Sequence, residues 1–187
     1  MLAGTPWNGW LHAAPIDRPS SAQAIGWSQS KLDDAKRLAE RLGTTALTIV
    51  WRGRIVDEWG RPEQSILCHS IRKSLISGLF GIAVAERRID ATQTLRSLEI
   101  DDLQGLSEIE RSARIVDLLT ARSGIYHPSA AEPASMRANR PARGSHRPGT
   151  YWFYNNWDFN ALGTIYRRLT GDDIFQAFKA KIADPIG

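Results

Sequence analysis

The pattern of apolar and polar positions predicts a largely helical chain. Residues 30–43, SKLDDAKRLAERLG, carry leucine and alanine at intervals of three and four, which is the spacing of one helix face. We expect Ser30 to be the N-cap of this helix and Gly43 to end it. An almost unbroken apolar stretch runs from Leu75 to Ala85 and is too long for a strand. A helix that is apolar on every side is typical of a protein interior, so this stretch predicts a central buried helix.

Two β-branched runs predict a hairpin. The sequences ALTIVW at 46–51 and RIVDEW at 54–59 stand on either side of Arg52-Gly53, which is a tight-turn sequence. These are the only strands that the pattern predicts, and an isolated hairpin is only marginally stable in water. Because both runs are apolar enough to need neighbouring strands and covering helices, we expect the hairpin to belong to a larger sheet.

Weaker patterns predict the remaining elements. Residues 1–29 are rich in proline, glycine and serine and are expected to form an extended lead-in, and 126–150 a long loop. A turn is predicted at 107–111, where Ser107 is followed three residues later by Glu110, the pattern of a capping box. The other predictions are a loop at 61–69, a helical turn near 92–98, a short helix over 116–121 that ends at Gly124, a helix over 158–169 that stops at Gly171, and a last helix over 172–183.

Composition places the chain among ordinary globular proteins. Of its 187 residues, 42% are hydrophobic and 24% are charged, which excludes a disordered tail, a collagen-like fibre and a membrane protein. The first residues lack the basic segment of a signal peptide and the length of a membrane span. We therefore expect no membrane span and, by default, a cytoplasmic location; a periplasmic one stays open if the true N-terminus is missing. The one cysteine, Cys68, excludes an internal disulfide framework.

Neither a metal, a cofactor nor a nucleic acid is expected as a partner. The four histidines lack metal-ligand spacing, and the sequence has no glycine-rich phosphate loop. The net charge of +4 is too small to indicate nucleic-acid binding. One basic cluster lies in the 126–150 loop without interleaved aromatic residues, which favours a solvated loop or the rim of a cleft. The cluster comprises Arg137, Arg140, Arg143, His146 and Arg147.

Candidate chemistry begins with a Ser-x-x-Lys pattern, Ser70 to Lys73, at the start of the apolar helix. At positions i and i+3, the hydroxyl and the amine project from one helix face. A serine needs a neighbouring base to attack a carbonyl, and a lysine held against apolar surroundings can have its pKa lowered enough to serve. The open alternative is a helix N-cap at Ser70 beside a partly exposed lysine.

A second Ser-x-x-Lys copy shows that the pattern alone does not identify a catalytic pair. Ser28 and Lys31 stand in the same relation at the start of the predicted amphipathic helix, where Lys31 can reach water at no cost. Lys73 instead precedes an apolar helix, where an unpaired ammonium is expensive. This context favours Ser70 and Lys73 as the catalytic pair.

A phenol and a carboxamide follow in the most aromatic part of the chain, YWFYNNWDF at 151–159. Tyr154 and Asn156 lie on one side of an extended or loop segment, so both can face one cleft. The neighbouring aromatic side chains, such as Tyr151 and Trp157, are expected to serve packing rather than chemistry.

Five segments in a fixed order carry a resemblance to a known family. They are SIRK with the apolar helix after it, LLTARSG, PGTYWFYNN, NALGTIYRRLTG and the ending IADPIG. In this combination the chain resembles the serine β-lactamase/penicillin-binding-protein superfamily over about residues 30–187. The similarity is to its class C-like branch, which includes D-alanyl-D-alanine carboxypeptidases, related esterases and nylon-oligomer hydrolases.

The resemblance implies an α+β fold of the β-lactamase/transpeptidase type. It also implies a serine hydrolase that acts through an acyl-enzyme on a small-molecule amide or ester, with Ser70 as the acylated nucleophile and Lys73 as its activating amine. Tyr154 would be the general acid or base, and Asn156 would bind the substrate or hold Lys73. The Ser70 backbone N–H would supply half of the oxyanion hole. The sequence leaves open which amide or ester is cleaved, and it leaves open the oligomeric state.

The chain departs from the family pattern after Tyr154. The third motif of the family, a strand with Lys or His, then Ser or Thr, then Gly, is absent from the sequence, as are the further strands of the sheet. We therefore expect residues 30–187 to be the N-terminal portion of such an enzyme, truncated at the C-terminus and holding the helical region and the first hairpin. The alternative is a catalytically incompetent relative that at most binds a ligand, since losing one oxyanion donor costs about 10²–10³ in rate.

Overall fold

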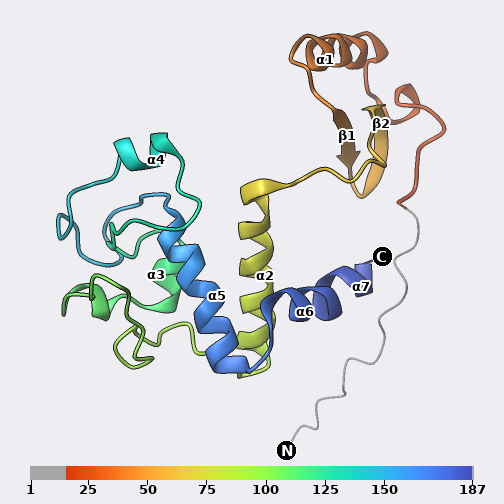
Figure 1. Ribbon diagram of the computed structural model, residues 1–187. Coiled ribbons are helices and arrows are strands. Elements are labelled where there is room, and N and C mark those ends of the chain that lie inside the picture. The colour runs from red at the N-terminus through yellow and green to blue at the C-terminus, as the bar shows by residue number, and fades with distance from the viewer. Residues whose placement is uncertain (1–15, 187) are drawn as a thin grey trace, which may run out of the picture. The chain divides into compact units, whose positions relative to one another are not determined.

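The structure is a computed structural model that describes residues 16–186 (Figure 1). The chain divides into two compact units, one ending at Cys68 and the other beginning at His69. Residues 1–15 of the predicted lead-in lie outside the described residues, and the rest of it contains a short 3₁₀ turn, Gln23–Ile25. Among the helices of the described part, none is long and apolar enough to cross a membrane.

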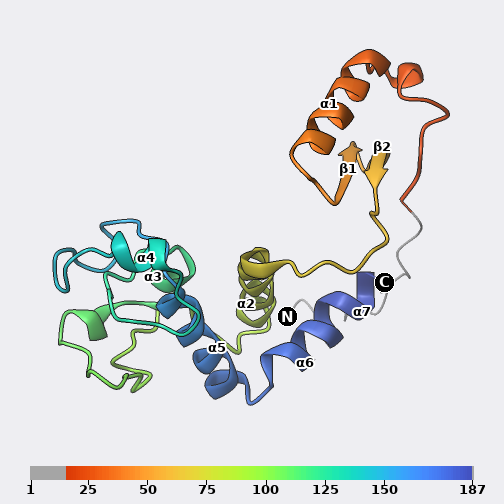
Figure 2. The same ribbon diagram turned by 45° about the horizontal axis from the view of Figure 1, so that its top comes forward.

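The N-terminal unit combines one helix with one hairpin (Figure 2). The helix begins slightly earlier than predicted, because its N-cap is Ser28, whose hydroxyl accepts a hydrogen bond from the Lys31 amide. Ser28 has an extended backbone, as a cap requires, whereas Ser30 already lies within the helix. The elements are α1 (Gln29–Arg41), β1 (Ala46–Trp51) and β2 (Arg54–Gly60).

The predicted hairpin is confirmed. Strands β1 and β2 pair in antiparallel fashion, with Trp51 opposite Arg54 next to the turn. The turn residues Arg52 and Gly53 have φ angles of 50° and 73°. Two left-handed residues in succession are what a tight two-residue hairpin turn requires. Within residues 16–186, the sheet consists of these two strands.

The second unit is helical and holds the hydrophobic core. Helices α2 and α5 lie side by side in this unit, and α6 follows directly after α5 (Figures 1 and 2). Its helices are α2 (Arg72–Ala85), α3 (Ile115–Leu119), α4 (Ala134–Ala138), α5 (Asn156–Thr170), α6 (Ile174–Phe178) and α7 (Asp184–Ile186), with 3₁₀ turns at His69–Ile71 and Glu110–Ser112 and a π-helical turn at Lys179–Ala183. Fully buried core residues include Leu95, Ile115, Leu118, Leu162, Ile165 and Tyr166.

Helix α2 is half buried, which corrects the prediction of a central buried helix. Leu79, Phe80 and Ala83 are almost completely buried. Leu75 and Val84, in contrast, are 40% and 41% exposed. In the described residues, α2 is packed by α5 and α6. The apolar composition of a helix shows what it can bury, whereas the number of neighbouring elements decides how much it does bury.

Residues 92–98 contain the predicted helical turn, because the Leu98 amide donates a hydrogen bond to the Thr94 carbonyl at 3.1 Å. The Leu95 amide donates a hydrogen bond to the carbonyl of Ala113, at 2.9 Å. The Leu95 N–H lies in the first turn, where it has no partner within the turn, and the neighbouring segment satisfies it. The capping box is confirmed, because the Ser107 amide donates to the Glu110 carboxylate and the Glu110 amide to the Ser107 hydroxyl.

The other helix predictions hold with shifted ends. Helix α3 corresponds to the short helix predicted before Gly124, and α5 ends at Gly171 as predicted, with a φ angle of 76° at that glycine. The helix predicted over 172–183 is divided into α6 and a π-helical turn, and α7 follows it. The long loop predicted over 126–150 contains the short helix α4.

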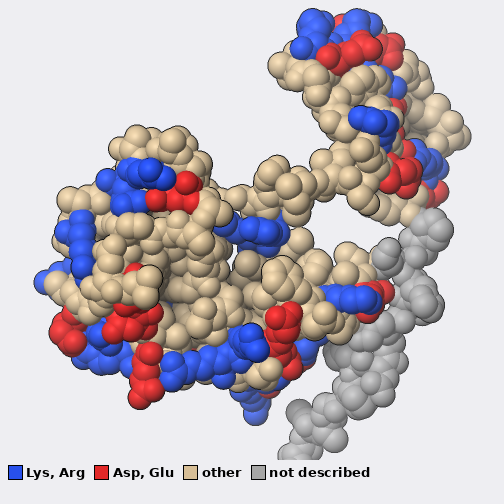
Figure 3. All heavy atoms as spheres, in the orientation of Figure 1, with Lys and Arg blue, Asp and Glu red and all other residues tan. Residues whose placement is uncertain are grey.

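Positive and negative side chains are interspersed on the face of the α5-containing unit that Figure 3 shows. Two arginines of the basic cluster are engaged within the chain. Arg140 forms an ion pair with Glu132, and Arg143 pairs with Glu110 at 2.8 Å.

Candidate active site

Three of the four candidate side chains meet at one point. The Lys73 ammonium donates one hydrogen bond to the Tyr154 hydroxyl and one to the Asn156 carboxamide oxygen, each at 2.5 Å. The ammonium also lies over the rings of Tyr154 and Phe159, at 4.0 and 4.8 Å from their centroids. These contacts stabilise the charge of a lysine that is partly withdrawn from water.

The beginnings of two helices build this site. Asn156 is the first residue of α5, and its predecessor Asn155 is the N-cap, whose side chain accepts a hydrogen bond from the Asp158 amide at 2.8 Å. Tyr154 comes immediately before the cap. Lys73 lies in the first turn of α2. The spacing of the phenol and the carboxamide thus brings both to one side, where the lysine meets them.

Ser70 lies in the 3₁₀ turn that leads into α2, where it is exposed. Its side chain is hydrogen-bonded to Tyr154. The phenol hydroxyl therefore connects Ser70 with Lys73, the amine that is expected to activate the serine. Of the two roles expected for Asn156, its contact is the one that holds Lys73.

The environment of the Tyr154 hydroxyl favours its ionised form. Burial raises the pKa of Tyr154, but the hydrogen bonds from Lys73 and Ser70, together with the Lys73 charge, lower it below the usual value of a tyrosine. Such a phenol gives up its proton more readily, and its phenolate can accept a proton from a neighbouring hydroxyl. The arrangement can therefore move a proton between Ser70 and Tyr154 while Lys73 stabilises the negative oxygen.

The second Ser-x-x-Lys copy has different surroundings. Ser28 caps α1 through its hydroxyl, and Lys31 is exposed on the surface of that helix. This copy therefore provides a natural control for experiments on Ser70.

Sequence reasoning missed a main-chain contact that orients Asn156. We call residues Pro128–Ala131 the strap. The Asn156 amide nitrogen donates a hydrogen bond to the carbonyl of Ala131 at 2.8 Å and lies 3.5 Å from that of Ala130. Because the nitrogen faces the strap, the carboxamide oxygen faces Lys73. Main-chain carbonyls have no sequence signature, so no pattern in the loop could have indicated this contact.

Sequence reasoning also missed Asp158, which is completely buried. One carboxyl oxygen accepts a hydrogen bond from the Ser123 hydroxyl at 2.6 Å, and the other has no partner among the described residues. Burial raises the pKa of Asp158 to about 7, although hydrogen bonds from Ser123 and Asn155 act in the opposite direction. A carboxylate among the aromatic residues of YWFYNNWDF was the available signal.

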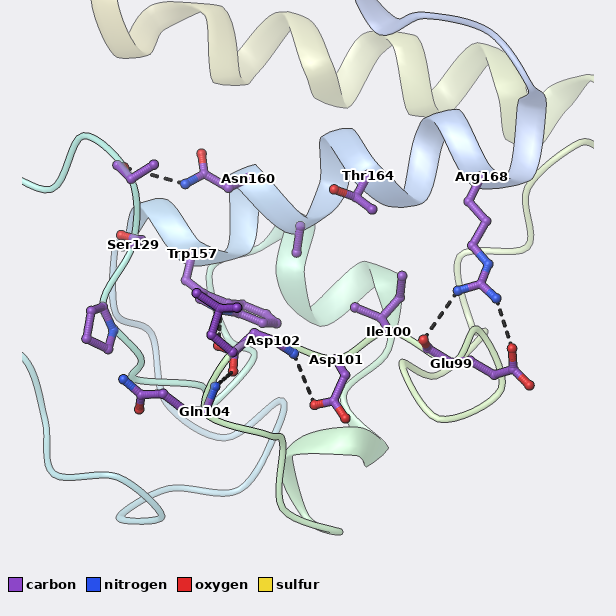
Figure 4. Close-up of a pocket in the computed structure, with 14 residues that line it drawn as sticks. Glu99, Ile100, Asp101, Asp102, Gln104, Ser129, Trp157, Asn160, Thr164 and Arg168 are labelled. Carbon is purple, nitrogen blue, oxygen red and sulfur yellow. Dashed lines mark hydrogen bonds and ion pairs between the residues drawn. The ribbon is translucent and has the colours of Figure 1, made fainter.

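A separate cavity of about 500 Å³ lies beside α5 (Figure 4). Asn160, Thr164 and Arg168 follow one another along the helix there, and Arg168 pairs with Glu99 at 3.0 Å. The lining also includes Ile100, Asp102 and Trp157, but none of the four candidate site residues. Among residues 16–186, no group of His, Cys, Asp or Glu side chains is arranged to hold a metal ion.

Comparison with known proteins adds a family and a fold. A family model described as Beta-lactamase matches residues 34–187. A crystal structure of SurE superposes with a TM-score of 0.56 at 20% sequence identity, covering 83% of this chain and 39% of that chain. A crystal structure of SurE with D-Leu gives a TM-score of 0.57 at 19% identity, covering 86% of this chain and 39% of that chain. These likenesses concern the fold alone, and this chain spans well under half the length of either SurE chain. Among curated proteins, none matches the sequence.

Proposed function

Because this chain belongs to the Beta-lactamase family, we propose that it carries the acylation machinery of a serine hydrolase, with Ser70 as the nucleophile. The observation that carries the proposal is the hydrogen-bonded row from Ser70 through Tyr154 to Lys73. The helices and the two-stranded antiparallel sheet are compatible with part of an α+β fold of this family.

The proposed reaction begins with attack of the Ser70 oxygen on the carbonyl of an amide or ester. The Tyr154 phenolate accepts the serine proton, and the Lys73 ammonium stabilises the phenolate before the transfer. Collapse of the tetrahedral intermediate leaves the acyl group on Ser70, and Tyr154 returns the proton to the departing amine or alcohol. Water then hydrolyses the acyl-enzyme with Tyr154 as its base. The Ser70 backbone N–H would donate one hydrogen bond to the oxyanion.

The substrate class within this proposal is an amide or an ester. Turnover by the 187-residue chain is itself part of the proposal, since the chain spans 39% of each SurE structure it matches. A chain that binds ligand without turnover is the alternative. The D-Leu in one SurE structure makes a D-leucine p-nitrophenyl ester a suitable first probe.

Covalent labelling tests the proposal directly. A fluorophosphonate probe is expected to modify Ser70, as located by peptide mass spectrometry. Ser70→Ala should abolish the labelling, whereas Ser28→Ala removes the serine of the second copy and should leave it unchanged. Equal labelling of Ser70→Ala and the unmodified chain would rule out Ser70 as the nucleophile. Labelling without continuous release of p-nitrophenol from the ester would favour the alternative of an incomplete enzyme.

A further inference from the structure

The cavity beside α5 continues the row of helix positions that begins at Asn156. Asn160, Thr164 and Arg168 line the cavity (Figure 4) and follow Asn156 at intervals of four residues. Side chains four residues apart are neighbours on a helix, so these residues form one continuous row along α5. The candidate active site lies at the first turn of this row, and the cavity lies at the turns after it.

The strap runs over α5 where the candidate active site ends and the cavity begins. Its Ala131 carbonyl accepts a hydrogen bond from the Asn156 side chain at 2.8 Å. Its Ala130 carbonyl lies 3.5 Å from the side-chain nitrogens of both Asn156 and Asn160. Ser129 and Ala130 also line the cavity, whereas Asn156 does not. A molecule in the cavity would therefore contact the strap without occupying the place of an acyl substrate.

The cavity has the size and the apolar wall of a small-molecule site. Its volume of about 500 Å³ lies within the usual range for such sites, about 300–1,000 Å³. Trp157 and Ile100 are 7% and 6% exposed and belong to the hydrophobic core, and together with Ala161 they provide the apolar part of the lining. Burial of an aliphatic group against this wall would favour binding. The wall therefore suits a ligand with an aliphatic side chain.

The charged side chains of the lining are already engaged within the protein. Arg168 pairs with Glu99 at 3.0 Å, and Asp101 pairs with Arg111. Asp102 accepts hydrogen bonds from a backbone amide at 2.8 Å and an indole N–H at 2.9 Å, and it lies 2.6 Å from a histidine Nδ1. A charged ligand would have to displace one of these partners or remain unpaired, and both cost free energy. The lining therefore favours an uncharged ligand.

Uncharged groups that both donate and accept hydrogen bonds complete the lining. Gln104 and Asn160 contribute carboxamides and Thr164 contributes a hydroxyl, and all three residues are exposed. A carboxamide carries a donor and an acceptor side by side. A ligand amide can satisfy both at once, whereas a ligand hydroxyl has a single proton to donate. Among uncharged groups, the amide is therefore the best match to these side chains.

We propose that the cavity beside α5 is a second binding site, for a small neutral amide with an aliphatic side chain, such as a capped amino acid. The aliphatic group would pack against Trp157 and Ile100, and the amide groups would pair with Asn160, Gln104 and Thr164. This site goes beyond the proposed function and does not rest on it, because its lining contains none of the groups that act on Ser70.

A titration of the full chain with N-acetyl-L-leucinamide, followed by two-dimensional NMR, tests the site. The reporter is the indole N–H of Trp157, which donates to Asp102 at the cavity. We expect its signal to shift with a dissociation constant of about 1 mM, as is usual for a ligand of this size. The indole N–H of Trp152, which is 57% exposed and outside the lining, should not shift. Equal shifts at both tryptophans, no shift at Trp157, or shifts confined to the surroundings of Tyr154 would overturn the proposal.

Two charged relatives of the probe test the neutrality of the ligand. At pH 6, N-acetyl-L-leucine carries a carboxylate and L-leucinamide carries an ammonium group, while the aliphatic side chain is the same in all three compounds. We expect each charged compound to bind about tenfold more weakly than N-acetyl-L-leucinamide, because its charge finds no free partner in the lining. Equal or tighter binding of the anion, through Arg168, or of the cation, through Glu99, would overturn the assignment of a neutral ligand.

Two variants of α5 locate the binding in the cavity. Thr164→Tyr fills the cavity from an exposed position, so we expect the shift of the Trp157 signal on titration to disappear. Arg167→Tyr makes the same change at an exposed residue of the same helix that lies outside the lining, and it should keep the dissociation constant of the unmodified chain. Undiminished binding by Thr164→Tyr would overturn the proposal. Ser70→Ala should bind the probe like the unmodified chain, so a failure of Ser70 labelling would contradict the proposed function and leave the cavity site standing.

Discussion

The Tyr154 hydroxyl is hydrogen-bonded to both Ser70 and Lys73, so the proposed proton transfer depends on this single group. We expect Tyr154→Phe to slow the labelling of Ser70 by about 10²–10⁴-fold, the usual contribution of a general acid or base. Tyr151→Phe, which changes an exposed tyrosine, should leave the labelling rate unchanged. A comparable loss of rate in both variants would contradict the role given to Tyr154.

The acidity of the same residue sets the expected pH dependence. Burial raises the pKa of Tyr154, but the hydrogen bonds from Lys73 and Ser70 bring it below the usual tyrosine value, which is about 10. The phenolate is the active base, so the labelling rate should rise with pH and level off below the range of an ordinary tyrosine. A rise of the same shape in Tyr154→Phe would assign the titration to another group.

Asp158 gives a prediction for stability. Its pKa is about 7 in the folded chain, against about 3.9 in an unfolded one. Between these values the folded state binds more protons than the unfolded state, so the free energy of unfolding should fall as the pH rises from about 4 to about 7, by roughly 4 kcal/mol. Urea unfolding at several pH values measures this slope.

Two variants assign that slope to the buried carboxyl. Asp158→Asn cannot ionise, so we expect a flatter pH dependence of the free energy of unfolding. Asp184→Asn, at an exposed aspartate of the same unit, should retain the slope of the unmodified chain. A slope that is unchanged in Asp158→Asn would place the titration elsewhere.

For single residues, the sequence was enough to name the candidates but not to predict which groups surround them. Ser70, Lys73, Tyr154 and Asn156 could be named because hydroxyl, amine, phenol and amide groups stand at short, recognisable spacings. The acceptor role of the Ala131 carbonyl could not be predicted, since it depends on a loop folding back over α5.

Among the secondary-structure elements, α2 shows most clearly how packing differs from composition. Leu79 is 1% exposed and Leu75 is 40% exposed in the same helix. We expect Leu79→Ala to lower the free energy of unfolding by about 2–5 kcal/mol, the range for a buried leucine. Leu75→Ala should cost clearly less, because much of its side chain already contacts water. Equal losses in thermal or urea unfolding would show that both faces of α2 are buried in solution.

Elements with local signals were the ones that the sequence predicted best. The hairpin follows from its Arg52-Gly53 turn, and the end of α5 follows from Gly171 in the left-handed conformation. The burial of α2 and the conformation of residues 92–98 depend on partners far along the chain. Leu95, for example, finds its hydrogen-bond acceptor at Ala113. Periodicity within a segment contains no information about such partners.

For the whole molecule, the division at Cys68 and His69 is the main feature that the sequence did not predict. Residues 61–68 between β2 and the next turn are all exposed, and they include Ile66 at 53% and Leu67 at 73%. A segment of this kind is a preferred site of proteolysis. The division therefore has a direct test.

Thermolysin cleaves before large apolar side chains, so we expect its first cuts within the described residues to fall before Ile66 and Leu67. Mass spectrometry of a time course should show the accumulation of a fragment that begins at one of these residues and retains the core of the second unit. A first cut within the core segment around Leu95 and Ile115 would contradict this division of the chain.

Ala131, whose φ angle of 55° is left-handed, also bears on how such a protein can be adjusted by mutation. Glycine, and to a lesser degree asparagine, adopts this conformation at lower cost than alanine. Substitutions at position 131 therefore change the conformational preference of the backbone, while the residues that touch Lys73 keep their identity. Natural selection or protein engineering can thus change the rigidity near the reacting serine through the backbone preference of residue 131 alone.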